Sequence, residues 1–453
     1  MATTRRNFLI STTAALSASR IIGANDRVQV GFIGYGLIGA QHVHDFQNLP
    51  DVDPAAVAEV YEPRLREGQA GCGPRAKGYA DFRRLLDDRD IQAVVISTPD
   101  HWHALQAIMA CAAGKDVYVE KPLTLFVREG RWMADAAKRY QRVVQVGTQQ
   151  RSGQHYADAV RLLRGGHIGK IHTVRMGYFR NVMPGFGSPP DSDPPPGMDY
   201  DLWLGPAPER HYNPSRSLYH FRWFWDYSGG QMTNLGAHEI DIVHWAMGVG
   251  APQAVVSTGG RLALADNGET PDTQDALFEY PGFTALWSHR EASGGRAQCG
   301  GLEFFGTKGS MTLNRSGFEV LPDMNVPPQN QIPEFLVEPA GGPQPVANAV
   351  ATPWCEHIKQ KVSNDLLASH ARNFVDCVKS RRQPVSSLEE EHGVATACHL
   401  ANISLRLKRR VQWNPEREEI IGDSEASALL LRPYRKPWDE VREQGTGKKS
   451  LGI

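Results

Sequence analysis

The 453-residue chain lacks several features that would assign it to a specialised class. It carries 49 basic and 50 acidic side chains, so no excess of one charge points to nucleic acid or to an anionic membrane surface as a partner. After residue 24 it has no apolar run long enough to span a bilayer. We therefore expect neither nucleic-acid binding nor membrane insertion of the mature chain.

Cysteine is scarce and metal motifs are absent. The six cysteines form no CxxC pair and most lie in apolar or helical stretches, so we expect buried free thiols. The HExxH motif fails because Ile242 stands where the second histidine would follow His238. This excludes a zinc protease of that type, and we expect no metal.

The most specific motif that is present is a glycine loop. Gly34, Gly36, Leu37, Ile38 and Gly39 belong to the segment GYGLIG, which follows a β run at 27–33 and opens a helix. Glu59 follows at the distance expected for an acceptor of a ribose hydroxyl. The pattern predicts a dinucleotide site that favours NAD, although Arg64 and Arg66 leave NADP open.

The alternation of elements predicts the fold class. Further strands at 55–61, 93–96, 116–120 and 143–147 alternate with helices at 81–88, 102–113 and 125–140, which indicates a doubly wound parallel sheet, a Rossmann domain over 25–150. A helix at 154–163 precedes strands at 171–179, 254–258, 276–280, 284–289, 301–305 and 310–313, and helices follow at 364–380 and 388–409. We predict an α+β domain over 151–440 with a large, open, mostly antiparallel sheet. A charged tail follows at 441–453.

Two further segments carry candidate catalytic residues. Lys121 stands between Glu120 and Pro122 at the end of a parallel strand, where ligands bind in open α/β sheets. Asn234 and His238 lie four apart, hence on one face of the helix that follows Gly229-Gly230. A surface lysine and a core histidine are the ordinary alternatives for these two residues.

Together these segments resemble the family of glucose-fructose oxidoreductase, inositol dehydrogenase and the rhizopine-catabolism protein (Gfo/Idh/MocA). The resemblance rests on the glycine loop, on STPDHWH at 97–103, on Glu120-Lys121-Pro122 and on the stretch from Gly229 to Trp245. It implies that Lys121 is the catalytic lysine and His238 the acid-base histidine. It also implies a cofactor site that includes Thr98, Asp100, Trp102, His103, Glu120, Lys121 and Gln149. Many members have aspartate where this chain has Asn234, and an amide cannot take up a proton.

Polar and aromatic residues after the first domain are candidates for binding a sugar, because aromatic rings stack on the apolar faces of sugars. They are Arg151, Tyr178, Arg180, Tyr200, Asp201, Arg222, Tyr227 and Asn234. The aromatic run 221–225 is more typical of a core or an interface. The aromatic residues on an open sheet also predict a homo-oligomer, a dimer or a tetramer.

The N-terminus indicates export. Thr4-Arg5-Arg6-Asn7-Phe8-Leu9 and the apolar run to Ala18 match a twin-arginine signal, which we place at 1–24. The twin-arginine translocase moves folded proteins, so the nucleotide would be bound before export to the periplasm or beyond. Free nicotinamide nucleotide is scarce outside the cell, which favours an enzyme that retains its cofactor.

Three functions remain open from the sequence. The first is oxidation and reduction of a sugar, glycoside or polyol hydroxyl by hydride transfer with a retained cofactor. The second is an NAD-dependent glycosidase, in which transient oxidation permits elimination of the aglycone, water adds and the hydride returns. The third is a nucleotide-bound sugar sensor without activity, for which Asn234 is the one argument.

Overall fold

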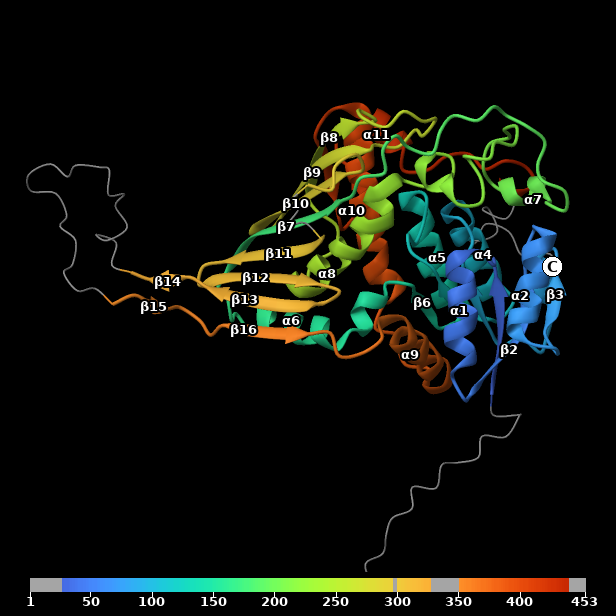
Figure 1. Cartoon of the computed structure of the whole chain (residues 1–453), viewed down its shortest axis with the longest axis horizontal. Helices are drawn as coiled ribbons and strands as arrows, with labels where there is room; N and C mark the ends of the chain where they lie inside the picture. Colours follow the sequence, from blue (N-terminus) through green and yellow to red (C-terminus); the bar gives the residue numbers. More distant parts are fainter. Residues whose placement is uncertain (1–26, 296–299, 327–349, 440–453) are drawn as a thin grey trace, which may run out of the picture.

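The computed structural model describes residues 27–295, 300–326 and 350–439. The twin-arginine segment, Cys299 and the tail 441–453 lie outside these ranges. The described part forms two sheets that lie side by side, with helices between and around them (Figure 1).

The first sheet is a six-stranded Rossmann sheet. Its order is β3-β2-β1-β4-β5-β6 and every neighbouring pair is parallel, which confirms the predicted fold class. Its strands are β1 (Val28–Ile33), β2 (Val52–Ala58), β3 (Lys77–Tyr79), β4 (Ala93–Ile96), β5 (Asp116–Val119) and β6 (Val144–Val146). The strand order reverses between β1 and β4, and ligands bind beyond the carboxyl ends of strands at such a point.

Five helices connect these strands. They are α1 (Leu37–Gln47), α2 (Glu62–Cys72), α3 (Phe82–Asp87), α4 (Asp100–Ala112) and α5 (Val127–Tyr140). The sequence did not predict α2 or β3. Only Gly68 of α2 is buried, so this polar helix has no apolar stripe from which it could be recognised.

The second sheet has ten strands and is mostly antiparallel, as predicted. Its order is β16-β13-β12-β11-β7-β10-β9-β8-β17-β18, and only β7 and β10 pair in parallel. The strands are β7 (Ile171–Phe179), β8 (Ala254–Gly260), β9 (Thr273–Tyr280), β10 (Phe283–Arg290), β11 (Gly300–Gly306), β12 (Gly309–Asn314), β13 (Gly317–Pro322), β16 (Ile358–Lys361), β17 (Val411–Asn414) and β18 (Glu419–Ile420). A two-stranded ribbon of β14 (Met324–Asn325) and β15 (Thr352–Pro353) projects from it (Figure 1).

Helices cover one face of this sheet. The main ones are α6 (Gln154–Arg164), α8 (Ala237–Met247) and α10 (Leu388–Leu407). The short elements of this part of the chain are η2 (Gln149–Ser152), α7 (Tyr200–Leu204), η3 (His220–Trp223), η4 (Met232–Gly236) and α11 (Ser424–Ala428), of which α7 packs on the Rossmann unit through Leu202. Side chains of α6, α8 and α10 form one apolar core with alternate residues of β7 to β13. The alternation of buried and partly exposed residues along β9 and β10 is what a sheet covered on one face requires.

The carboxyl-terminal part of the chain returns to the Rossmann unit. Phe374 of α9 (Leu366–Ser380) packs with Phe46 and Tyr118. Further on, the ring of Trp438 lies 4.7 Å from that of Trp102. Single apolar residues after residue 410 are buried in both units: Trp413 and Leu430 pack in the core of the second sheet, and Tyr434 and Trp438 pack on the Rossmann unit.

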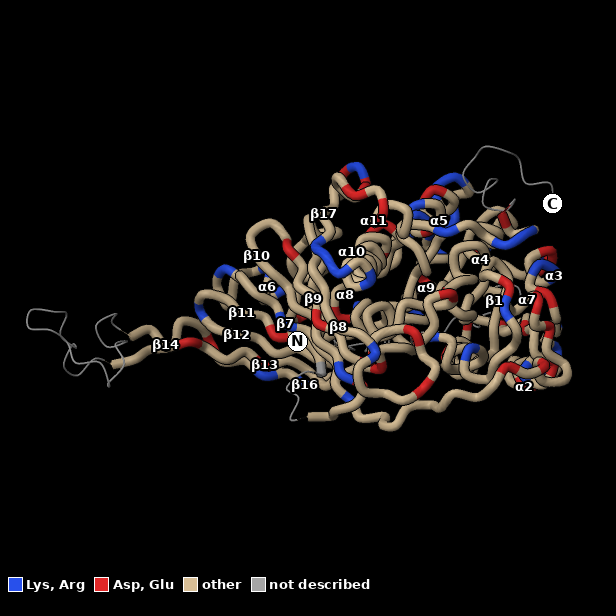
Figure 2. The backbone as a smooth tube through the Cα atoms, turned by 90° about the horizontal axis from the view of Figure 1, so that it is seen from above, with Lys and Arg blue, Asp and Glu red and all other residues tan. Residues whose placement is uncertain are grey.

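Four properties of residues 27–295, 300–326 and 350–439 concern membranes, metals, thiols and charge. Within these ranges no helix has both the length and the apolar character needed to cross a membrane. No cluster of three or more His, Cys, Asp or Glu side chains able to hold a metal occurs among the same residues. The five described cysteines are free, and Cys111, Cys377 and Cys398 are buried. Basic and acidic residues are interspersed over both halves of the molecule (Figure 2).

Candidate functional site

A cavity of about 340 Å³ lies where the carboxyl edge of the Rossmann sheet meets the second unit. Its walls come from the loops after β1, β2, β4 and β5, from η4 and α8, and from the segment 198–228. Fourteen residues that the sequence proposed for the site line it: Gly34, Gly36, Leu37, Ile38, Glu59, Thr98, Asp100, Trp102, Glu120, Lys121, Gln149, Arg222, Asn234 and His238. Most of the proposed cofactor site and both proposed catalytic residues therefore share one cavity.

The three glycines of the loop have distinct steric roles. A Cβ on Gly39 would lie 2.3 Å from the carbonyl oxygen of Gly34, so this glycine permits close packing of α1 on β1. Gly34 has a φ of +89° and faces the backbone of Ser97. At Gly36, in contrast, the nearest atom to an added Cβ is Nη1 of Arg64 at 3.9 Å. The space in front of Gly36 is open, and no side chain caps the amino end of α1, which is the geometry that receives a pyrophosphate.

Glu59 is held directly after β2 with its carboxylate at the cavity wall. Its Oε2 accepts a hydrogen bond of 2.8 Å from the backbone N–H of Tyr35, and its Oε1 accepts one of 3.1 Å from that of Tyr61. These two bonds fix the carboxylate while leaving lone pairs for a ribose hydroxyl. Arg64 lines the same end of the cavity, so the geometry is compatible with either nucleotide.

Lys121 follows β5, and its amine lies in the cavity wall. Its Nζ donates to Oδ1 of Asn234 at 3.0 Å and to the Asn234 carbonyl oxygen at 3.3 Å. Burial lowers the pKa of Lys121 to about 8, with Glu120 opposing this effect and Arg222 adding to it. Near neutral pH the amine can therefore both give up and accept a proton, as an acid-base group requires.

A chain of hydrogen bonds fixes the Asn234 amide towards Lys121. Oε1 of Glu291 accepts from Nε2 of Gln231 at 2.6 Å and from Nε of Arg180 at 2.6 Å. A carboxylate can only accept hydrogen bonds, so the NH₂ group of Gln231 faces Glu291 and the amide oxygen of Gln231 faces Asn234. That oxygen accepts a hydrogen bond from Nδ2 of Asn234 at 3.2 Å. The oxygen of Asn234 is then left for Lys121.

This arrangement corrects the expected pairing of Asn234 with His238. Residues Met232–Gly236 form a π-helical turn, and α8 begins only at Ala237. Among the described residues no hydrogen bond joins the side chains of Asn234 and His238. The side chain of Asn234 contacts Gln231 and Lys121 instead.

A carboxylate at position 234 should therefore act on the lysine. We expect Asn234→Asp to raise the pKa of Lys121 from about 8 towards its ordinary value of 10.5, because a negative charge about 3 Å from the amine stabilises the ammonium. The pH dependence of Lys121 acetylation, followed by mass spectrometry, measures this without a substrate. Asn234→Ser is the matched control, because it removes the amide without adding charge. An unchanged titration in Asn234→Asp would contradict the contact.

His238 lies in the first turn of α8 and lines the cavity while being only 2% exposed. Burial, followed by the positive charges of Lys121 and Arg315, holds the pKa of His238 well below its usual value. Its Nδ1 is buried and has no hydrogen-bond partner among the described residues. The ring is thus neutral near pH 7 and can accept a hydrogen bond from a bound hydroxyl group.

Two buried carboxylates support this wall. Oε1 of Glu120 lies 2.7 Å from Nε2 of His42. Burial opposes ionisation of Glu120, but the His42 contact and the charge of Lys121 outweigh it and lower the pKa of the carboxyl. Asp100 accepts a hydrogen bond from the Ser228 hydroxyl at 2.5 Å, and burial raises the pKa of this carboxyl.

Gly39 and His103 were proposed for the cofactor site but do not line the cavity. The ring of His103 lies between two carbonyl oxygens, with Nδ1 2.8 Å from that of Pro122 and Nε2 2.8 Å from that of Thr98. It ties the loop after β4 to the segment that carries Lys121. His103 therefore supports the site rather than contacting a ligand in this structure.

The structure places Arg151 away from the cavity, in a buried ion-pair network. Its Nε donates to Oδ1 of Asp241 at 2.7 Å, and its Nη1 lies 2.9 Å from Oε1 of Glu390. Glu391 is a third carboxylate, with Oε1 3.7 Å from Nε. These partners join η2 to α8 and α10, so the predicted role of Arg151 in substrate binding is replaced by one in packing.

Five other proposed substrate residues also lie outside the cavity wall: Tyr178, Arg180, Tyr200, Asp201 and Tyr227. Arg180 belongs to the network of Glu291, and its guanidinium lies over the ring of Tyr178. Asp201 pairs at the surface with Arg435 at 2.6 Å. Tyr200 and Tyr227 both pack on Trp203, which itself lines the cavity. Charge and aromatic character alone did not separate the lining residues from those behind them.

Several residues that line the cavity were not predicted, because they come from short helices, loops and turns. Trp203, Tyr219 and Phe221 form an aromatic wall, and Arg315 reaches the cavity from the turn between β12 and β13. The aromatic run 221–225 is in large part core, as predicted, since Phe221, Trp223 and Phe224 are buried. No local pattern marks Arg315, since its position depends on the pairing of two distant strands.

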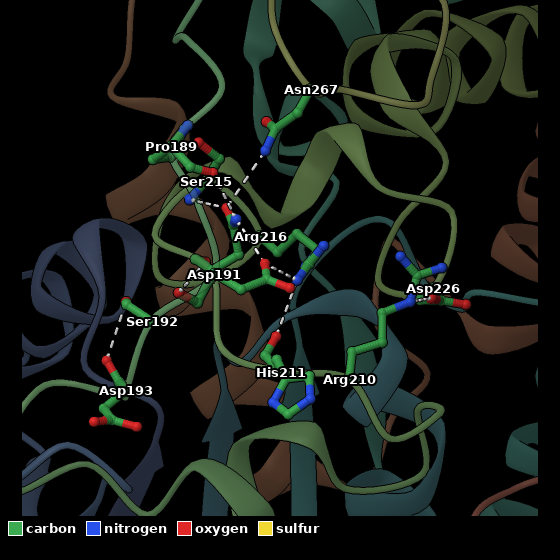
Figure 3. Close-up of polar contacts among 12 residues, drawn as sticks. Pro189, Asp191, Ser192, Asp193, Arg210, His211, Ser215, Arg216, Asp226 and Asn267 are labelled. Carbon is green, nitrogen blue, oxygen red and sulfur yellow. Dashed lines mark hydrogen bonds and ion pairs between the residues drawn. The ribbon is translucent and has the colours of Figure 1, made fainter.

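Polar contacts order the long segment that carries the aromatic wall (Figure 3). Oδ1 of Asp191 accepts from Nδ2 of Asn213 at 2.9 Å and from Nη2 of Arg216 at 2.6 Å. Nε of Arg210 lies 2.6 Å from Oδ2 of Asp226. These contacts fix the Pro- and Gly-rich stretch from 183 to 214 against the residues that follow it.

Comparison with known proteins gives two family-model matches. The Gfo/Idh/MocA oxidoreductase model, described as an NAD-binding Rossmann fold, matches residues 28–148. The model of the C-terminal alpha/beta domain of this oxidoreductase family matches residues 184–257 and 356–440.

Individual relatives are more distant. Myo-inositol 2-dehydrogenase of Thermotoga maritima is 24% identical over 402 residues, which cover 87% of this chain and 100% of that protein. A glycosyl hydrolase family 109 protein of a Shewanella species is 32% identical over 165 residues, which cover 35% of this chain and 36% of that protein. Levoglucosan dehydrogenase, solved with NADH and levoglucosan, has a TM-score of 0.62 at 19% identity, covering 85% of this chain and 99% of that one. At this identity the last match shows a shared fold.

Proposed function

Because this chain belongs to the Gfo/Idh/MocA family of NAD-binding oxidoreductases, we propose that it transfers hydride between a retained nicotinamide nucleotide and a hydroxyl-bearing carbon of a sugar, glycoside or polyol. The observation that carries the proposal is the meeting of Lys121 and His238 with the glycine loop in one cavity. Inositol dehydrogenase among the relatives and levoglucosan dehydrogenase among the structural neighbours support a polyhydroxylated substrate.

The residues present fit a dinucleotide. The open space before Gly36 and the uncapped amino end of α1 suit a pyrophosphate, and the fixed carboxylate of Glu59 suits a ribose diol. When bound, the nicotinamide supplies the hydride acceptor or donor. Trp203, Tyr219 and Phe221 offer apolar faces for a sugar ring.

Proton transfer falls to the chain's own residues. Lys121, with a pKa of about 8, accepts the hydroxyl proton in its neutral form when the alcohol is oxidised and returns it from its ammonium form when the ketone is reduced. Asn234 orients the amine without neutralising it. His238 remains neutral and accepts a hydrogen bond from a neighbouring hydroxyl, which fixes the carbon that faces the cofactor.

We expect the purified protein to release NAD rather than NADP when it is denatured, because the Glu59 carboxylate repels a 2′-phosphate. Chromatography of the released nucleotide checks this. Glu59→Gln should lower the ratio of the NADP to the NAD dissociation constant by about 10- to 100-fold, because a hydrogen bond to a charged group contributes a binding free energy of this size. Arg64→Gln is the matched control at the same cavity end: it removes a positive charge beside Gly36, so it should weaken binding of both nucleotides without reversing the preference for NAD. Recovery of mainly NADP would contradict the role of Glu59.

A redox-neutral glycosidase is the second candidate, favoured by the 165-residue match to the glycosyl hydrolase family 109 protein. That match covers about a third of the Shewanella protein, so it carries less weight than the match to the inositol dehydrogenase. Product analysis with the nucleotide-loaded protein separates the two. Net oxidoreduction yields an oxidised and a reduced product, whereas the glycosidase releases a free sugar and an aglycone in equal amounts.

Export and assembly belong to the same proposal. The twin-arginine motif supports transport of the folded, nucleotide-loaded protein by the twin-arginine translocase. Replacing Arg5-Arg6 by Lys-Lys and following the protein by cell fractionation tests this. The partly exposed face of the ten-stranded sheet, with Val256 39% and Leu286 38% exposed, supports a homo-oligomer, which light scattering tests.

A further inference from the structure

The charged side chains that line the cavity differ in how far hydrogen bonds and ion pairs neutralise them. Its three carboxylates all have hydrogen-bond donors: Glu59 has two backbone N–H groups, Glu120 has His42, and Asp100 has Ser228. Its four cationic side chains are Arg64, Lys121, Arg222 and Arg315. Arg64 lies beside Gly36, on the side that suits the pyrophosphate. The other three cations therefore lie on walls for which the nucleotide phosphates offer no counter-charge.

Arg222 and Arg315 have little to neutralise them. Nη1 of Arg222 donates to the carbonyl oxygen of Tyr219 at 2.7 Å, and the guanidinium lies over the rings of Tyr219 and Phe221. Arg315 donates only to Oε1 of Gln150, at the long distance of 3.4 Å. Neither guanidinium forms an ion pair with any carboxylate in residues 27–295, 300–326 and 350–439.

The acidic groups near these two arginines are buried carboxyls whose pKa values burial raises, Asp100 near Arg222 and Glu239 near Arg315. Both guanidinium charges act on Lys121 and lower its pKa by repulsion. Glu239 is the acidic group that Arg315 influences, yet burial raises the pKa of Glu239 to about 7 in spite of the arginine. Arg315 is exposed and Arg222 is half-buried at the cavity, so water solvates both guanidinium groups, and an oxyanion of a ligand can take the place of that water.

We propose that the substrate of this enzyme carries an oxyanion, a carboxylate or a phosphate, which Arg222 and Arg315 bind while a hydroxyl group of the same molecule faces Lys121. The planar guanidinium of each arginine can donate two parallel hydrogen bonds to such a group. The aromatic wall at Tyr219 and Phe221 holds the sugar ring between the oxyanion and the reacting carbon. This inference rests on the proposed function, because it specifies which sugars the redox site accepts.

The test compares sugars that differ in one group. Nucleotide-loaded protein is titrated with D-glucose, D-glucuronate and D-glucose 6-phosphate, with the corresponding galactose and mannose series, and with inorganic phosphate, by calorimetry. Within at least one series we expect an anionic sugar to bind about 10- to 100-fold more tightly than its neutral partner, the range for hydrogen bonds to a charged group. The acid and the phosphate ester within that series distinguish a carboxylate from a phosphate ligand.

Two variants locate the effect. Arg222→Met and Arg315→Met should each remove most of the preference for the anionic sugar and weaken binding of inorganic phosphate. Arg175→Met is the matched control, because Arg175 lies on β7 over the ring of Phe305 and does not line the cavity. The control should bind every probe as the parent does. Equal affinity for neutral and anionic sugars in all three series, together with no phosphate binding, would overturn the inference, as would a preference that survives both arginine variants.

The two proposals fail in different ways. Reduction of the bound nucleotide is followed through the absorbance of NADH in the same samples. If neutral sugars reduce the nucleotide as fast as anionic ones, the redox function stands and the oxyanion site is refuted. If anionic sugars bind in an arginine-dependent manner but no sugar and no glycoside is turned over, the oxyanion site stands and the proposed function is refuted.

Discussion

Replacing Lys121 by methionine is expected to lower turnover by about two to four orders of magnitude, the usual effect of losing a general acid-base group. Methionine keeps the length and apolar volume of the lysine stem, so the cavity wall and the packing against Pro122 persist. What disappears is the amine that donates to Asn234 and titrates near pH 8. Single-turnover reduction of the bound nucleotide by a verified substrate measures the loss.

The pH dependence separates a proton-transfer role from one in binding. In the parent protein, alcohol oxidation should accelerate as the pH rises through about 8, because the neutral form of Lys121 is the base. Lys121→Arg keeps the positive charge but cannot lose its proton in this range, so this acceleration should vanish while the nucleotide stays bound. Turnover that is unchanged in Lys121→Met, or that falls only because the nucleotide is lost, would remove Lys121 from the chemistry.

The fold was predictable where the pattern of residues is local. The strand β7 (Ile171–Phe179) was predicted to the residue, because β-branched and aromatic residues recur along it. The glycine loop likewise identified β1 and α1, since its chemistry is specific to one turn. The polar helix α2 and the short edge strand β3 have no comparable signature. Their conformation is set by packing against β2, which a single segment of sequence does not reveal.

The site was predictable where it lies at the ends of Rossmann strands. Glu59, Asp100 and Lys121 follow β2, β4 and β5, and the rule that parallel strands end at one edge brings them together. The second wall was harder, because it is assembled from a long irregular segment and a turn. Arg222 was found through its aromatic neighbours, whereas Arg315 depends on strand pairing that no motif records.

The partner of Asn234 is where the structure differs from the contact that the helical spacing suggested. A regular helix would have placed Asn234 one turn below His238, and the expected pair followed from that spacing. In the structure a π-helical turn spans Met232–Gly236, and the Asn234 side chain contacts Lys121 and Gln231. Such turns are frequent at functional sites and have no sequence signature, so the contact could be found only from the structure.

Arg151→Met should destabilise the protein by about 3–5 kcal/mol, the usual consequence of removing one partner of a buried ion pair. Arg151 and Asp241 have side chains that are 2% and 0% exposed, so water cannot take the place of the guanidinium. The Asp241 carboxylate and the nearby Glu391 would then remain buried without their cation. Urea denaturation at pH 7, with the nucleotide present, measures the free energy of unfolding.

The dependence of this loss on pH follows from Asp241. Burial, with Glu391 adding to it, already holds the pKa of Asp241 well above its ordinary value, although Arg151 opposes the shift. Without Arg151 the pKa rises further, so the folded variant keeps a proton that the unfolded chain releases above about pH 4. As the pH rises, the folded variant either loses this proton and buries a carboxylate without its cation, or keeps it while the unfolded chain is stabilised by having released its own. Both lower the free energy of unfolding. The destabilisation should therefore be larger at pH 7 than at pH 5.

The double variant Arg151→Met/Asp241→Asn is the matched control. It removes both charges of the closest pair at nearly constant volume, so it should recover part of the stability that the single variant loses. Substrate affinity at saturating nucleotide should change little in either variant, because Arg151 lies behind α8 and not in the cavity. A single variant that unfolds at the same urea concentration as the parent, yet no longer binds a verified substrate, would return Arg151 to the substrate-binding role that its sequence position suggested.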